Sequence, residues 1–223
     1  MAKIEAVLFD LDGTLLDSAL DFHFVINQML EQRDRPSLSL ECLKHHVSNG
    51  ARAMVSYAFG IDNTDPQFEP LKAEFLQKYL RHLNVKSVLY PGIGQVLDFL
   101  QSHCIPWGVV TNKPELYTGL IMHHQQLHDR AAVVICPDHV LNTKPDPEPL
   151  FLACQKMSVQ AHNCCYIGDH IRDIEAGNSA GMTTIGCNYG YLNKDELSSH
   201  WGANFLVDQP LQIIDIIKRL LKQ

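Results

Sequence analysis

Six short apolar runs are spaced along the chain, and most are separated by segments with a helical repeat of apolar positions. Several runs are apolar at consecutive positions, which is typical of strands covered on both faces of a sheet. Alternating strands and helices predict an α/β fold in which a parallel sheet carries helices on both faces. The predicted strands cover residues 4–9, 106–110, 132–136, 164–167, 183–187 and 205–207.

Residues 17–90 follow a different pattern, because helical repeats replace the apolar runs over this stretch. We therefore predict that residues 1–16 and 91–223 form the core with the sheet, and that residues 17–90 form a small all-helical cap domain inserted after the first strand. Ser18, with Asp21 three residues later, predicts a capping box at the start of the first inserted helix. Such an insertion would lie over the carboxyl edge of the sheet as a lid.

Composition and charge limit the classes of partner. The 223 residues carry a formal net charge of −7 and no run of basic side chains, which argues against a nucleic-acid-binding protein. No apolar stretch approaches the roughly 18 residues of a membrane-spanning helix, and the chain start lacks a signal-peptide pattern. The seven cysteines show no C-x-x-C spacing, so we expect no disulfide framework. We expect a cytoplasmic protein, a monomer or weak dimer, that binds neither nucleic acid nor a membrane.

Two aspartates close the first apolar run. Asp10 and Asp12 are two positions apart at the end of the predicted strand, so their side chains point the same way while Leu11 turns toward the core. Ligands of open α/β sheets bind at this carboxyl edge. Two adjacent carboxylates repel each other unless a cation lies between them. The pair therefore predicts a bound divalent metal ion.

Polar groups follow three further predicted strands at the same edge. Thr111 and Asn112 follow the second strand, Lys144 lies in a loop after the third, and Asp169 and Asp173 follow the fourth. Parallel strands deliver such groups to one place. A hydroxyl, an ammonium and several carboxylates around one point predict a site for phosphoryl transfer.

These motifs resemble those of haloacid dehalogenase superfamily phosphatases. The resemblance covers the whole chain and implies a Rossmann-like α/β core with a small helical cap after the first motif. It also implies roles for the individual side chains. Asp10 would be the nucleophile and Asp12 the general acid and base, whereas Thr111 and Lys144 would bind the phosphoryl group and Asn112 would also bind the substrate.

The same resemblance implies a magnesium site. Asp10, the main-chain carbonyl of Asp12 and Asp169 would bind Mg²⁺, and Asp173 would orient these ligands. A carboxylate nucleophile divides the hydrolysis of a phosphomonoester into transfer to Asp10 and hydrolysis of the acyl phosphate.

The expected substrate is a small phosphorylated metabolite with a carboxylate. Arg52, in the run 45–52 of the predicted cap, offers a bidentate clamp for that carboxylate. Several further segments, including residues 50–55 and 107–114, are similar to bacterial N-acetylmuramic acid 6-phosphate phosphatases of peptidoglycan recycling, within a broader phosphoglycolate phosphatase-like group. An amino-sugar phosphate and 2-phosphoglycolate therefore both stay candidates. A sugar phosphomutase and a catalytically silent binding protein are the rival classes.

Overall fold

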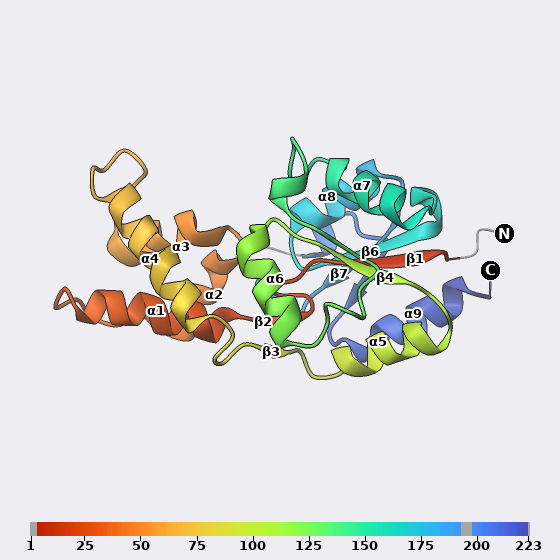
Figure 1. Cartoon of the computed structure of the whole chain (residues 1–223), viewed down its shortest axis with the longest axis horizontal. Helices are drawn as coiled ribbons and strands as arrows, with labels where there is room; N and C mark the ends of the chain where they lie inside the picture. The colour runs from red at the N-terminus through yellow and green to blue at the C-terminus, as the bar shows by residue number, and fades with distance from the viewer. Residues whose placement is uncertain (1–3, 193–197, 223) are drawn as a thin grey trace.

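A central parallel sheet organises the fold in the computed structural model, which describes residues 4–192 and 198–222 (Figure 1). The sheet has six strands in the order β5-β4-β1-β6-β7-β8, and every neighbouring pair is parallel. The predicted α/β fold is therefore confirmed. The strands are β1 (Ala6–Phe9), β4 (Trp107–Val110), β5 (Val133–Ile135), β6 (Cys164–Gly168), β7 (Thr183–Cys187) and β8 (Phe205–Val207).

Helices cover both faces of the sheet, which explains why β1 is apolar at consecutive positions. All four residues of β1 are buried, with Val7 and Phe9 in the apolar cluster of one face and Ala6 and Leu8 in that of the other. The helices α7 and α8 lie on one side of the sheet and α5 and α9 on the other (Figure 1). Their bounds, with that of α6, are α5 (Ile93–Ser102), α6 (Glu115–His124), α7 (Glu148–Met157), α8 (Ile171–Ser179) and α9 (Leu211–Leu220).

Short 3-10 helices complete the core at Pro137–His139, Ala161–Asn163 and Ser198–His200. Within the described residues, no helix is long and apolar enough to cross a membrane.

Four helices form a second layer beyond the carboxyl end of β1 (Figure 1). They are α1 (Ala19–Glu31), α2 (Leu40–Val47), α3 (Gly50–Phe59) and α4 (Phe68–His82). They enclose an apolar cluster of their own, because the large side chains of each helix repeat on one face. We call these four helices the cap. The domain boundaries expected after residues 16 and 90 stay a prediction.

A two-stranded antiparallel pair joins the cap to the core. Its strands are β2 (Leu16–Asp17) and β3 (Val88–Leu89), with Leu16 opposite Leu89 and Asp17 opposite Val88. The sequence pattern does not predict this pair, because a strand of two residues is too short to show a periodicity. The chain thus enters and leaves the cap at neighbouring points.

The capping box expected from Ser18 and Asp21 is wrong. Ser18 does precede α1, but its side chain accepts no hydrogen bond from the helix backbone, and its hydroxyl donates to Oδ1 of Asp12 at 2.5 Å. The buried carboxylate of Asp21 accepts from the backbone N–H groups of Lys86, at 2.8 Å, and Ser87, at 3.2 Å. Both residues fit the local capping motif, but their side chains form hydrogen bonds with residues outside it.

Candidate active site

The end of β1 places Asp10 and Asp12 at the junction of core and cap. The backbone N–H of Asp10 donates to the carbonyl of Ile167 in β6 at 2.8 Å, which fixes the strand end. The Asp10 side chain is 16% exposed and the Asp12 side chain 18%, so both reach the cavity described below. Leu11, between them, is fully buried. The alternation expected from the strand period is therefore present.

Lys144 lies at the centre of the site, and its side chain is 1% exposed. Its Nζ lies 3.0 Å from Oδ1 of Asp10 and 2.7 Å from Oδ1 of Asp173, and it donates to the phenol oxygen of Tyr166 at 2.7 Å. Burial opposes the charged form, but the carboxylates of Asp10 and Asp173 outweigh it and raise the pKa of the Lys144 ammonium. The lysine therefore stays charged beside Asp10.

Asn112 holds the loop that carries Lys144. Its Nδ2 donates to the Lys144 carbonyl at 2.9 Å, and its Oδ1 accepts from the Lys144 backbone N–H at 3.2 Å. Thr111 is buried at the carboxyl end of β4 and lines the same cavity as Asp10. The structure thus brings both residues to the edge expected from the sequence, with the Asn112 amide turned toward the lysine loop.

Three carboxylates cluster at the edge of the sheet. Oxygen atoms of Asp10, Asp169 and Asp173 lie within 4.8 Å of one another. Asp169 accepts from the backbone N–H of Tyr191 at 2.8 Å and from the hydroxyl of Thr14 at 3.1 Å. Burial first, and then the charges of Asp10 and Asp173, raise the pKa of Asp169 well above its usual range. A hard divalent cation among these oxygens would remove that penalty, so the donor set fits Mg²⁺.

Gly13 lets the chain pass close to this cluster. Its φ of +83° lies in the left-handed region, and a Cβ atom at this position would overlap the carboxylate of Asp169. The turn after Asp12 therefore requires glycine both for its backbone conformation and for space.

Lys113 is a site residue that sequence reasoning missed. Its Nζ lies 2.9 Å from Oδ2 and 3.1 Å from Oδ1 of Asp12, and it donates to the phenol oxygen of Tyr79 in α4 at 2.9 Å. The ammonium also lies 4.8 Å from the ring centroid of Phe22 in α1. The available signal was its position directly after Thr111 and Asn112, at the end of an apolar strand.

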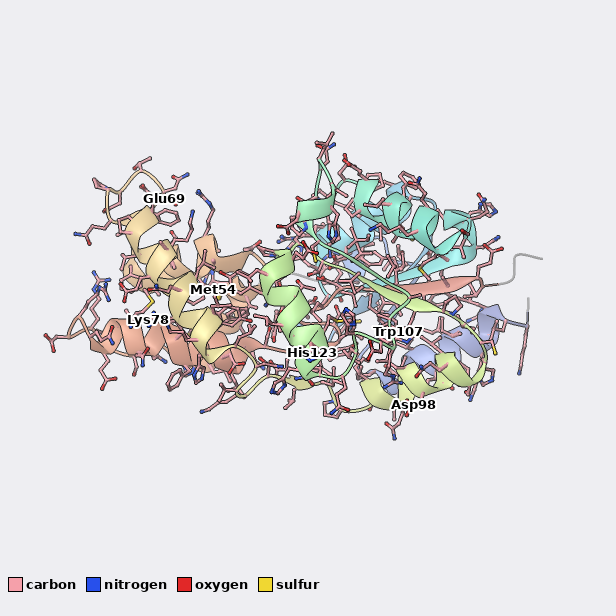
Figure 2. All side chains as sticks on the ribbon, in the orientation of Figure 1. Met54, Glu69, Lys78, Asp98, Trp107 and His123 are labelled. Atoms are coloured by element: carbon pink, nitrogen blue, oxygen red, sulfur yellow. The ribbon has the colours of Figure 1, made fainter. Side chains whose placement is uncertain are left out.

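A cavity of about 430 Å³ lies between the sheet edge and the cap. Its floor contains Asp10, Asp12, Thr111 and Lys144. Its cap wall is mostly apolar, and Figure 2 labels one of its side chains, Met54. The apolar and aromatic residues of that wall are Phe22, Val47, Ala51, Met54, Phe75, Leu76 and Tyr79.

Arg52 also lines the cavity, but its guanidinium is already paired. Nη2 lies 2.9 Å from Oε1 of Glu69, and the Arg52 side chain is 58% exposed. Glu69 lies at the outer edge of the cap, on the first turn of α4 (Figure 2). The expected carboxylate clamp at Arg52 stays a prediction.

The fold and the motif positions agree with a family model for haloacid dehalogenase-like hydrolases, which matches residues 7–187. The chain belongs to the haloacid dehalogenase-like hydrolase family. The resemblance noted in the sequence is therefore confirmed, and the parallel sheet with its carboxyl-edge aspartates is the core of a haloacid dehalogenase-like protein.

Relatives cover almost the whole chain. An N-acetylmuramic acid 6-phosphate phosphatase of Pseudomonas aeruginosa is 43% identical over 219 residues, which cover 98% of this chain and 97% of the relative. A phosphoglycolate phosphatase of Xanthomonas campestris is 41% identical over 208 residues, 93% of this chain and 94% of the relative. The crystal structure of a predicted phosphoglycolate phosphatase from Haemophilus somnus has a TM-score of 0.86 at 26% identity, covering 97% of this chain and 99% of that one.

Proposed function

We propose that this haloacid dehalogenase-like protein is a magnesium-dependent phosphomonoesterase that works through an aspartyl-phosphate intermediate. The observation that carries the proposal is the position of Asp10. Its carboxylate lies 3.0 Å from the buried ammonium of Lys144, at the edge of a cavity and within a cluster of three carboxylates. A nucleophile, a charge-balancing lysine and a candidate cation site thus meet at one point.

In the first half of the reaction, an oxygen of Asp10 attacks phosphorus and the bond to the ester oxygen breaks. Asp12 protonates the leaving oxygen as general acid. In the second half, the Asp12 carboxylate accepts a proton from water, and the water oxygen attacks phosphorus. The bond between phosphorus and Asp10 then breaks and phosphate leaves.

Charge balance and positioning supply most of the rate. Enzymes accelerate phosphomonoester hydrolysis by up to ~10²¹, whereas general acid catalysis contributes about 10²- to 10⁴-fold. Lys144 and Thr111 would bind the phosphoryl oxygens. Asp10, Asp169 and the main-chain carbonyl of Asp12 would hold Mg²⁺, with Asp173 orienting them through its contact with Lys144. Bound Mg²⁺ would neutralise charge on the phosphoryl group.

The preferred substrate in this proposal is N-acetylmuramic acid 6-phosphate. The protein would hydrolyse it in the cytoplasm during peptidoglycan recycling, as a monomer or weak dimer. The 43% identical relative carries that activity in its name. The mostly apolar cap wall and the volume of about 430 Å³ suit a sugar with acetyl and lactyl methyl groups better than a two-carbon acid. The alternative substrate is 2-phosphoglycolate, because relatives at 41% identity carry that name.

A phosphate-release screen tests both parts of the proposal. The purified protein is incubated with Mg²⁺ and N-acetylmuramic acid 6-phosphate, 2-phosphoglycolate, other sugar phosphates or p-nitrophenyl phosphate. We expect the highest kcat/KM with the amino-sugar acid. Faster turnover of 2-phosphoglycolate would favour the alternative. A persistent acyl phosphate without phosphate release would favour a phosphomutase, and no reaction at all would defeat the proposal.

A further inference from the structure

Four cationic side chains line the cavity, and they differ in what neutralises them. Three of them pair with carboxylates: Arg52 with Glu69, Lys113 with Asp12, and Lys144 with Asp10 and Asp173. The fourth is Arg172. No carboxylate in residues 4–192 or 198–222 lies within ion-pair distance of its guanidinium. The cavity therefore contains one cation that forms no ion pair with a described carboxylate, although its charge acts on the Asp173 carboxylate over a longer distance.

Two polar side chains that are not carboxylates hold the Arg172 side chain in place. Its Nε donates to Nδ1 of His170 at 3.1 Å, and its Nη2 donates to Oδ1 of Asn49 at 2.8 Å. The backbone N–H of Arg172 also donates to Nδ1 of His170, at 3.2 Å. Neither an imidazole nor an amide carries a negative charge at neutral pH, so neither His170 nor Asn49 neutralises the guanidinium. The guanidinium is therefore held in one orientation before a ligand binds, which lowers the entropy cost of ligand binding.

The position of Arg172 joins core and cap at the cavity. Arg172 lies in the first turn of α8, three residues after Asp169, whereas Asn49 directly precedes α3 of the cap. Asn49, Gly50 and Ala51 line the cavity, and the Asn49 side chain makes no capping hydrogen bond to α3. The N-terminus of α3, the positive end of the helix dipole, would therefore stabilise an anion bound beside the guanidinium.

We propose that Arg172 binds the carboxylate of the substrate, with Asn49 and the first turn of α3 beside it, and is the specificity residue of this site. This inference rests on the proposed function, in which Lys144 and the candidate cation site take the phosphoryl end. A second anionic group on the substrate is best matched by a second cation, and Arg172 is the cavity cation that forms no ion pair with a described carboxylate. Arg52 would have to break its salt bridge with Glu69 before it could bind a carboxylate of the substrate.

Matched substrates separate the carboxylate from the rest of the ligand. N-acetylglucosamine 6-phosphate is N-acetylmuramic acid 6-phosphate without the lactyl group, and 2-hydroxyethyl phosphate lacks the carboxylate of 2-phosphoglycolate. We expect Arg172→Gln to lower kcat/KM for the two carboxylate substrates about 10- to 100-fold, the usual range for a lost charged hydrogen bond. The kcat/KM of the two substrates without a carboxylate and of p-nitrophenyl phosphate should change by less than about threefold, which also shows that the variant is folded. The kcat/KM of Arg172→Lys for the carboxylate substrates should lie between those of the parent and Arg172→Gln, because lysine keeps the charge but cannot donate two parallel hydrogen bonds.

Two control variants complete the experiment. Arg52→Gln should lower kcat/KM for the carboxylate substrates much less than Arg172→Gln, and Arg130→Gln, which breaks an exposed pair with Asp98, should change nothing. A larger loss of kcat/KM in Arg52→Gln than in Arg172→Gln would overturn the proposal, as would equal losses on substrates with and without a carboxylate. The carboxylate substrate whose kcat/KM falls more in Arg172→Gln than that of its carboxylate-free analogue is the one that Arg172 recognises.

A binding measurement separates this inference from the proposed function. Calorimetry on an Asp10→Asn background compares N-acetylmuramic acid 6-phosphate with N-acetylglucosamine 6-phosphate without turnover. Arg172→Gln should remove the difference in Kd between the two ligands. A parent protein that hydrolyses no phosphomonoester would defeat the proposed function, whereas an unchanged Kd difference in Arg172→Gln would defeat the role of Arg172.

Discussion

Lys113 and Asp12 form a salt bridge with 2.9 Å between Nζ and Oδ2, and the lysine side chain is 7% exposed. The same ammonium donates to Tyr79 and lies over the ring of Phe22, both of which belong to the cap. A residue of the core therefore connects the proposed general acid and base to two cap helices.

The first prediction concerns this connection. Lys113→Met should lower kcat for p-nitrophenyl phosphate by roughly 10- to 100-fold, because Asp12 loses the partner that orients it. Steady-state kinetics with Mg²⁺ measure the effect. Lys78→Met is the control, because Lys78 pairs with Glu74 on the same cap at 3.6 Å and lies outside the cavity. An unchanged kcat in Lys113→Met would show that Asp12 is positioned without the lysine.

The second prediction concerns the nucleophile. Asp10→Asn should lower kcat by more than about 10⁴-fold while the melting temperature stays close to that of the parent, because an amide oxygen cannot form the acyl phosphate. Rapid acid quench of the parent during turnover, followed by mass spectrometry, should place one phosphoryl group on the peptide with Asp10. Phosphorylation of another residue, or near-parental turnover in Asp10→Asn, would contradict the mechanism.

The third prediction links magnesium, pH and stability. Burial and the charges of Asp10 and Asp173 raise the pKa of Asp169, so the folded protein keeps a proton there at pH values where the unfolded chain has lost it. The free energy of unfolding of the metal-free protein should then fall as pH rises above about 4 and through the folded pKa. A cation that binds the ionised carboxylates would reverse this loss.

Thermal unfolding with and without MgCl₂ tests this link. The gain in melting temperature from Mg²⁺ should be larger at about pH 8 than at about pH 5, since protons compete with the cation at the lower pH. Asp169→Asn should remove most of that gain. An equal gain at both pH values, or a full gain in Asp169→Asn, would place the cation elsewhere.

The fourth prediction concerns Tyr191, whose buried phenol oxygen accepts from the backbone N–H groups of Ser18, at 2.7 Å, and Ala19, at 2.9 Å. It also donates to Oδ1 of Asp17 at 2.8 Å. Tyr191→Phe should lower the free energy of unfolding by about 1–3 kcal/mol, because it leaves the start of α1 without its acceptor. Tyr117→Phe is the matched control in urea denaturation, because the Tyr117 hydroxyl makes no hydrogen bond to another described residue.

Residues 6–9 show why the strands could be predicted from the sequence. Strands covered on both faces are apolar at consecutive positions, so their composition alone identifies them. The proposed site residues follow β1, β4 and β6 at the carboxyl edge of the sheet. Asp10, Lys144 and Asp169 therefore meet as expected, because topology brings strand ends together without further information from the side chains.

Lys113 and Ser18 show what the sequence does not reveal. The partners of Lys113 are 101 residues away at Asp12 and 34 residues away at Tyr79, so its contacts depend on how the cap lies over the core. Ser18 fits a helix-start motif but donates to Asp12 instead. Local patterns predict elements well, whereas the choice between competing partners is made by packing.

The β2–β3 pair has a consequence for how such a protein can change its preference. Leu16 and Leu89 are paired neighbours, and the backbone N–H of Tyr90 donates to the carbonyl of Leu15 at 3.0 Å, so the chain leaves the sheet and returns to it at almost one spot. A foreign module with closely spaced ends could be grafted at this junction without moving Asp10 or Lys144. Selectivity can then be exchanged as a unit, provided that the new module supplies contacts to Lys113 and Asp12 like those of Tyr79 and Ser18.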